Sequence, residues 1–202
     1  METDAATCFK SANEPEETQT AGFGKFRFVS APERLRRFLE DIMKKLRIYL
    51  DTSVINFLFA DDAPEKRDVT RKFFEKHISN YEVFVSAVVL DEIRRTRDIS
   101  KRDRLLGAIT SRDMKQLPLE PETEIKNLSK KYIVKGVIPL KKNDDALHLA
   151  ICTVHSIDVL ISWNFEHLAN INKERRVLAV NQELGYYYPM RITTPLEVMG
   201  IE

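Results

Sequence analysis

The sequence predicts an α/β fold with a mainly parallel central sheet, and two observations lead to that prediction. Short runs of β-branched and aromatic residues alternate with longer amphipathic segments from about residue 46 onward. Hydrophobic residues make up 43% of the 202-residue chain, which is enough for one buried core. Because helices separate the expected strands, the chain can return after each helix to add a parallel strand.

The expected strands are short apolar segments bounded by polar or turn-forming residues. The first is rich in β-forming residues between Leu46 and Leu50, and its apolar positions alternate with Arg47 and Tyr49. The tail around Met190 is expected to add the last strand. In chain order, strands are expected over 46–50, 81–85, 115–119, 158–162, 177–180 and 190–193.

The expected helices carry apolar residues at spacings of three and four. Thr52 or Ser53 can cap the first helix, and Gly136 is a suitable residue just past the end of the helix that begins near Pro121. In chain order, helices are expected over 54–59, 69–79, 88–96 with the basic stretch after it, 121–135, 143–155 and 164–170.

The N-terminal part of the chain has a different composition. Residues 1–24 carry five acids and one base without apolar periodicity, which is typical of disorder. Ser30 and Glu33 then match a capping box for one short amphipathic helix. We therefore expect an extension over 1–42, either an appended regulatory segment or translated upstream sequence, and one domain over 43–202.

Charge and cysteine content exclude several classes of protein. The 32 basic and 31 acidic residues give a net charge of +1, which argues against a strongly basic protein that coats nucleic acid. Two cysteines are too few for a disulfide scaffold. No apolar run approaches the ~20 residues of a membrane span, and the first residues lack the features of a signal peptide. We expect a cytoplasmic protein without a membrane partner.

Polar side chains recur where expected strands end and helices begin. Asp51 directly follows the first strand, and Asn164 holds the same place after the strand over 158–162. Glu92 and Asp145 lie early in two helices. Each has a structural alternative, because Asp and Asn are common helix caps and acids favour the first turn of a helix. Together they form a set of oxygen donors of the kind that binds Mg²⁺ or Mn²⁺.

Other enzyme classes fit the sequence less well. The chain has no Gly-rich phosphate-binding loop ending in Lys, no Cys/His spacing typical of zinc sites, and no Gly-x-Ser-x-Gly elbow. A phosphatase of the haloacid-dehalogenase type requires a second Asp two positions after the first, where this chain has Ser53. A receiver domain requires an Asp and a Lys after later strands, and neither is found convincingly.

Four segments of the chain resemble the PIN-domain family in their order and spacing, within about residues 46–195. The segments are 49–55, 88–93, 143–150 and 160–168. The resemblance implies a Rossmann-like three-layer domain and a ribonuclease that depends on Mg²⁺ or Mn²⁺. Many bacterial members are VapC-type toxins of type II toxin–antitoxin pairs, and residues 163–167 are similar to a subgroup with a Trp-Asn-Phe-x-His signature.

By this resemblance, Asp51, Glu92 and Asp145 match the first three metal-binding acids of the family. Asn164 stands at the place of the common fourth acid, where it ligates the metal or orients a metal-bound water. Because Asn removes one negative charge, a PIN fold that binds RNA or protein with little or no catalysis is the alternative. The resemblance also implies an RNA substrate, a cognate antitoxin protein and a homodimer as partners.

Two further groups of residues complete the expected site. One group supports the metal ligands from nearby positions, and it consists of Thr52, Ser53, Asp144 and His148. The other group is basic and could hold the RNA backbone, with a solvated helix face as its structural alternative. This second group consists of Arg94, Arg95, Arg97, Lys141 and Lys142.

Overall fold

The computed structural model describes residues 33, 35–36 and 44–200. It groups the chain into two units, Met1–Met43 and Lys44–Glu202. Most of the expected extension therefore lies outside the described residues, including the segment expected to be disordered and the proposed cap Ser30. Of that extension, Glu33, Leu35 and Arg36 are described and are helical.

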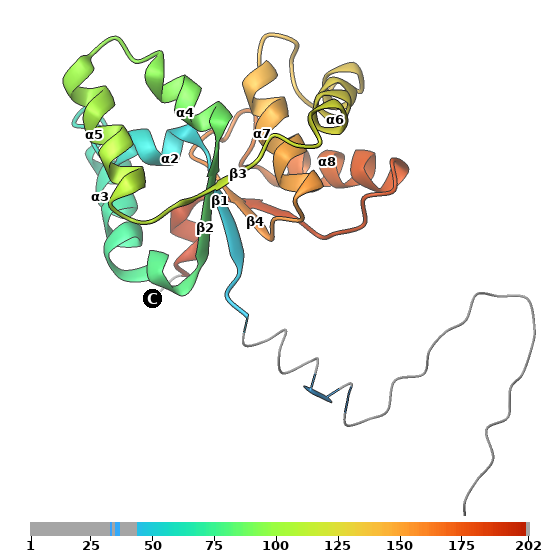
Figure 1. Cartoon of the computed structure of the whole chain (residues 1–202), viewed down its shortest axis with the longest axis horizontal. Coiled ribbons are helices and arrows are strands. Elements are labelled where there is room, and N and C mark those ends of the chain that lie inside the picture. The colour runs from blue at the N-terminus through green and yellow to red at the C-terminus, as the bar shows by residue number, and fades with distance from the viewer. Residues whose placement is uncertain (1–32, 34, 37–43, 201–202) are drawn as a thin grey trace, which may run out of the picture. The chain divides into compact units, whose positions relative to one another are not determined.

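Five parallel strands form the centre of the second unit (Figure 1). They lie in the spatial order β3-β2-β1-β4-β5, and every neighbouring pair runs parallel. The strands are β1 (Arg47–Leu50), β2 (Glu82–Ser86), β3 (Lys115–Leu117), β4 (Val159–Ile161) and β5 (Arg191–Thr193). The predicted α/β fold with a mainly parallel sheet is confirmed.

Helices connect successive strands and cover both faces of the sheet. Before β3 come α2 (Thr52–Phe57), α3 (Pro64–Lys72), a π-helical turn (Phe73–His77), a 3₁₀ turn (Ile78–Asn80), α4 (Ala87–Arg94) and α5 (Ile99–Thr110). After β3 come α6 (Glu122–Val134), α7 (Asn143–Val154), α8 (Ile171–Glu183) and α9 (Pro195–Val198). Figure 1 shows α3 and α5 on one side of the sheet and α6, α7 and α8 on the other.

The chain reverses its direction across the sheet at the β1/β4 pair. It moves from β1 outward to β3, and then crosses back to β4 on the other side of β1. Right-handed crossovers place the connecting helices on opposite faces when the direction reverses in this way. Ligands of open α/β sheets bind at the carboxyl ends of the strands beside such a reversal.

The core lies between the sheet and its two helical layers. Ile48, Tyr49 and Leu50 of β1 are fully buried, as are Leu160 and Ile161 of β4. A central parallel strand is covered on both faces, so its residues are apolar without alternation. None of the helices in the described part of the chain combines the length and the hydropathy that crossing a bilayer requires.

Two expected elements are wrong. Residues 177–180 form part of α8 rather than a strand, and Val177 and Val180 are both buried because a spacing of three places them on one helix face. Residues 164–170 form turns rather than a short helix, and Asn170 caps α8 by accepting a hydrogen bond from the Lys173 N–H at 2.9 Å.

The helical region that was expected over 88–96 and the basic stretch after it is divided. It forms α4 and α5, and Asp98 caps α5 by accepting a hydrogen bond from the Lys101 N–H at 3.0 Å.

Candidate functional site

Asp51 lies at the carboxyl end of β1 and joins that end to the end of β4. Its side chain is 4% exposed and caps α2, with Oδ1 accepting hydrogen bonds from the backbone N–H groups of Ser53 at 2.7 Å and Val54 at 3.3 Å. Its Oδ2 accepts a hydrogen bond from Ser162 Oγ at 2.6 Å. The Ser162 hydroxyl in turn accepts from the Asn164 N–H at 2.9 Å. Asp51 is therefore a helix cap, as one interpretation of the sequence predicted, and it also lies at the sheet edge where ligands bind.

A chain of hydrogen bonds holds Glu92. Its Oε2 accepts a hydrogen bond from Thr52 Oγ1 and lies 3.0 Å from His148 Nε2. The other ring nitrogen, His148 Nδ1, lies 2.7 Å from the hydroxyl of Tyr49, which is also 2.7 Å from Ser86 Oγ. Because Tyr49, Ser86 and His148 are buried, this network fixes the Glu92 carboxylate from inside the core.

Asp145 and Asn164 face each other across the other side of the site. Asn164 Nδ2 lies 3.3 Å from each carboxylate oxygen of Asp145. The Asn164 Oδ1 accepts a hydrogen bond from the His167 N–H at 3.1 Å. As it stands, Asn164 therefore presents its amide NH₂ to Asp145, and coordination of a metal through its oxygen requires the amide to turn.

The acids experience opposite electrostatic environments. Burial raises the pKa of Asp145, and the nearby Asp51 carboxylate raises it further. Burial would also raise the pKa of Glu92, but the hydrogen bond and charge of His148, with the bond from Thr52, lower it overall. For His148, burial opposes the charged form, but Glu92, Asp51 and Asp145 raise its pKa overall. The charges of His148, His167 and Lys142 lower the pKa of Asp145, but burial and the Asp51 charge leave it raised overall.

The chemistry of these donors fits a hard divalent cation. In the described part of the chain, no Lys or Arg nitrogen lies within 4.0 Å of the Asp51 or Asp145 carboxylates, although the two acids repel each other. Carboxylate oxygens are the usual ligands of Mg²⁺ and Mn²⁺. Among residues 33, 35–36 and 44–200, no three His, Cys, Asp or Glu side chains lie close enough together to form a metal-binding group. Glu92 stands apart in its bond to His148.

The four residues expected to support the ligands have distinct contacts. Thr52 and His148 contact Glu92, as described above. The Ser53 hydroxyl donates to Asp51 Oδ1 and accepts a hydrogen bond from the Trp163 N–H at 2.8 Å. Asp144, by contrast, points toward α4, where its Oδ2 lies 2.8 Å from Arg95 Nη1.

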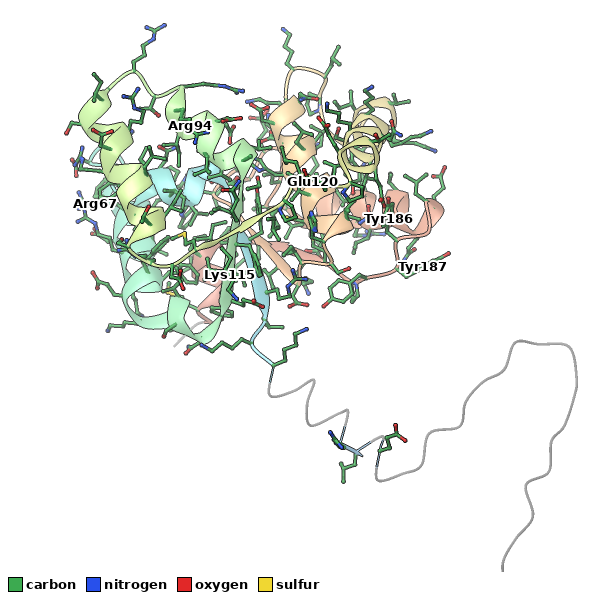
Figure 2. All side chains as sticks on the ribbon, in the orientation of Figure 1. Arg67, Arg94, Lys115, Glu120, Tyr186 and Tyr187 are labelled. Carbon is green, nitrogen blue, oxygen red and sulfur yellow. The ribbon has the colours of Figure 1, made fainter. Side chains whose placement is uncertain are left out.

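The five basic residues expected to hold RNA are exposed and differ in their partners. Arg94 lies at the surface of α4 and pairs with Asp91 at 2.8 Å (Figure 2). Arg95 pairs with Asp144. Arg97, Lys141 and Lys142 have no carboxylate within 4.0 Å in the described part of the chain.

Sequence reasoning missed three residues of this network, namely Tyr49, Ser86 and Ser162. Ser86 ends β2 and Ser162 follows β4 directly, so each occupies the same place as Asp51 does after β1. A polar residue at the end of an apolar strand was therefore an available signal for both serines. Tyr49 lies within β1 and looks like an ordinary core residue, so its sequence position carries no such signal.

A comparison with family models matches residues 48–173 to the PIN domain. The comparison with curated proteins gave no match. The matched region contains β1 except Arg47, all of β2, β3 and β4, and the four residues that the resemblance places in the site. With its parallel sheet and nuclease-type fold, the chain belongs to the PIN-domain family.

Proposed function

We propose that this chain is a ribonuclease that depends on Mg²⁺ or Mn²⁺ and hydrolyses phosphodiester bonds in RNA. The observation that carries the proposal is the chain of hydrogen bonds that links the carboxylates of Asp51 and Asp145 through Ser162 and Asn164, at the carboxyl edge of a PIN-type sheet. Carboxylates that lie close together are costly to keep charged, and a bound cation lowers that cost.

Asp51, Glu92 and Asp145 would hold the cation, which supplies charge stabilisation and a more acidic bound water. The chain's own residues orient these acids. Ser53 and Ser162 fix the two oxygens of Asp51, while Thr52 and His148 fix Glu92. In the hydrolysis, an oxygen–phosphorus bond forms from water and the bond to the leaving oxygen breaks.

The decisive experiment is Asp51→Asn in a cleavage assay on RNA with Mg²⁺ or Mn²⁺. Asn also caps helices well, so the variant should fold while losing the cleavage activity. Asp113→Asn is the matched control, because Asp113 is exposed just before β3, and its positive φ of 49° is tolerated by Asn. Cleavage by the Asp51 variant at the wild-type rate would overturn the proposal.

One observation favours a second candidate, a PIN fold that binds RNA or protein without cleaving. Asn164 adds no negative charge, and its amide NH₂ already donates hydrogen bonds to both oxygens of the Asp145 carboxylate. Titration of Mn²⁺ by calorimetry into the wild type and Asn164→Asp separates the two candidates. The nuclease proposal expects binding by the wild type and tighter binding by the variant. Absence of both Mn²⁺ binding and RNA cleavage in the wild type would overturn the nuclease proposal, and RNA binding without cleavage would support the second candidate.

We further propose that the ribonuclease is the toxin of a type II toxin–antitoxin pair, because the chain resembles a family that has many VapC-type toxins among its bacterial members. Induced expression should then stop bacterial growth, and co-expression of a small protein encoded beside it should restore growth. The Asp51→Asn variant should leave growth unaffected. Normal growth on induction of active enzyme would refute the toxin role without affecting the nuclease proposal.

A further inference from the structure

Three aromatic rings and one lysine gather beside the site. We define this aromatic–lysine cluster as Phe57, Lys66, Trp163 and Phe165. Lys66 Nζ lies 4.9 Å from the ring centre of Phe57, 5.7 Å from that of Trp163 and 5.5 Å from that of Phe165. The ring centres of Phe57 and Phe165 each lie 6.0 Å from that of Trp163, in edge-on geometry. The residues come from α2, α3 and the turn after β4.

The cluster has a fixed base and an open face. Trp163 is buried, and its Nε1–H donates a hydrogen bond to Thr70 Oγ1 at 2.9 Å. Phe165 is 48% exposed, although its backbone oxygen accepts a hydrogen bond from Asn170 Nδ2 at 2.7 Å. An aromatic ring that is half exposed on a fixed backbone can stack on a flat ligand at a small entropic cost.

Lys66 gives the cluster a positive charge without an ion-pair partner. Within the part of the chain that the structure describes, no carboxylate lies within 4.0 Å of its ammonium group. The residue also lines a surface cavity of about 240 Å³ with Ala63, Pro64 and Glu65. A cation beside exposed aromatic surface suits a ligand that is both flat and negatively charged.

The cluster is continuous with the proposed catalytic residues. Trp163 and Phe165 flank Asn164, whose side chain contacts Asp145. The Trp163 N–H donates to Ser53, which also donates to Asp51. A base stacked on Phe165 and a phosphodiester bond held at the acids could therefore belong to neighbouring nucleotides of one strand.

We propose that the aromatic–lysine cluster is a subsite for one nucleotide of single-stranded RNA. Its base stacks on Phe165, and a phosphate lies beside Lys66. A duplex hides the faces of its bases within the stack, so this subsite discriminates against double-stranded RNA. The inference rests on the proposed function, because it assumes an RNA substrate, but it concerns binding rather than cleavage.

The test measures RNA binding by the full chain in a chelator, where no metal-dependent cleavage takes place. The probes are a fluorescent single-stranded RNA of about ten nucleotides and a duplex of the same sequence. Phe165→Leu keeps an apolar side chain and removes the stacking ring, and Lys66→Met removes the charge. Tyr187→Leu and Lys130→Met are the controls. Both residues are exposed, and Tyr187 lies on the opposite side of the molecule from α3 (Figure 2).

Phe165→Leu should weaken single-strand binding about fivefold or more and leave duplex binding unchanged. Lys66→Met should reduce the slope of log affinity against log salt by about 0.7, the value for one phosphate contact on a single strand. Trp163 is the only tryptophan of the chain, so its fluorescence should change on binding of the single strand. The two controls should bind both probes as the wild type does.

Two results would overturn the subsite. In the first result, Phe165→Leu binds the single strand as tightly as Tyr187→Leu does, which would assign the cluster to packing or to a protein partner. The other is an equal loss for the duplex. Failure of the proposed function gives a different result. If the chain binds the single strand through Phe165 but never cleaves RNA with metal, only the proposed catalysis is refuted. Cleavage that is lost in Asp51→Asn while Phe165→Leu binds normally refutes only the subsite.

Discussion

Replacement of Tyr49 by Phe should destabilise the domain from within its core. The Tyr49 side chain is fully buried, and burial is the main reason that the pKa of its phenol lies well above the usual value. Its hydroxyl contacts both Ser86 Oγ and His148 Nδ1 at 2.7 Å. The substitution removes one oxygen and changes no other volume, so it isolates this pair of hydrogen bonds.

The size of the effect follows from the groups that the hydroxyl leaves behind. Ser86 is 0% exposed and His148 is 2% exposed, and within the described residues neither Ser86 Oγ nor His148 Nδ1 has another hydrogen-bond partner. A buried polar group without a partner costs about 1–3 kcal/mol. Two such groups should lower the free energy of unfolding of Tyr49→Phe by about 2–6 kcal/mol, a large part of a typical domain's stability.

Urea denaturation in a chelator measures this loss, and a double-mutant cycle assigns it. Ser86→Ala should cost less in the Tyr49→Phe background than in the wild type, because the hydroxyl that it removes has already lost its partner. Tyr187→Phe is the control, and as an exposed position it should change the free energy of unfolding by less than about 0.5 kcal/mol. A loss below that limit for Tyr49→Phe, or an equal cost of Ser86→Ala in both backgrounds, would refute the network.

The Glu92–His148 pair should make the stability of the metal-free protein depend on pH. Because the pKa of His148 is raised, this residue contributes fully to the free energy of unfolding below its ordinary pKa of 6.5. That contribution is lost as the pH rises through the raised pKa. Because the pKa of Glu92 is lowered, this residue contributes fully to the free energy of unfolding above its ordinary pKa of 4.5. That contribution is lost as the pH falls through the lowered pKa. The difference in unfolding free energy between the wild type and His148→Gln should therefore be largest between these two values and smaller at alkaline pH, as urea denaturation across that range can check. Arg95→Ala should change stability by less than about 1 kcal/mol in thermal denaturation, because the Arg95–Asp144 pair is largely exposed, and a larger loss would show that it holds α4 to α7.

Much of the fold and of the site edge could be predicted because local patterns determine them. The strand over 46–50 is followed at once by Asp51, and parallel strands bring their carboxyl ends to one edge, so the place of Asp51 follows from sequence order alone. The run at 177–180 misled because it is a short apolar run in which Val177 and Val180 favour strands, whereas the core contacts that decide the element come from distant residues.

The contacts within the site could not be predicted in the same way. Tyr49 and His148 are 99 residues apart in the chain, and nothing local to either residue indicates that their polar atoms meet. Asp144 and Asp145 are neighbours, yet Asp144 turns to Arg95 while Asp145 faces Asn164. Successive residues of a helix project about 100° apart, so the sequence indicates that they differ but not which partner each one finds.

The four positions of the site differ most in how their charge is compensated, and this gives Asn164 a physical role. Glu92 is stabilised in its charged form by His148, so it needs no cation to remain ionised. Asp51 and Asp145 repel each other, and a fourth carboxylate at position 164 would add to that repulsion in the metal-free protein. The Asn164 amide instead donates hydrogen bonds to Asp145, which offsets part of the repulsion on its carboxylate. An Asn at this position therefore favours a stable metal-free domain over the tightest possible metal binding, and the proposed nuclease would bind its cation reversibly at Asp51, Glu92 and Asp145.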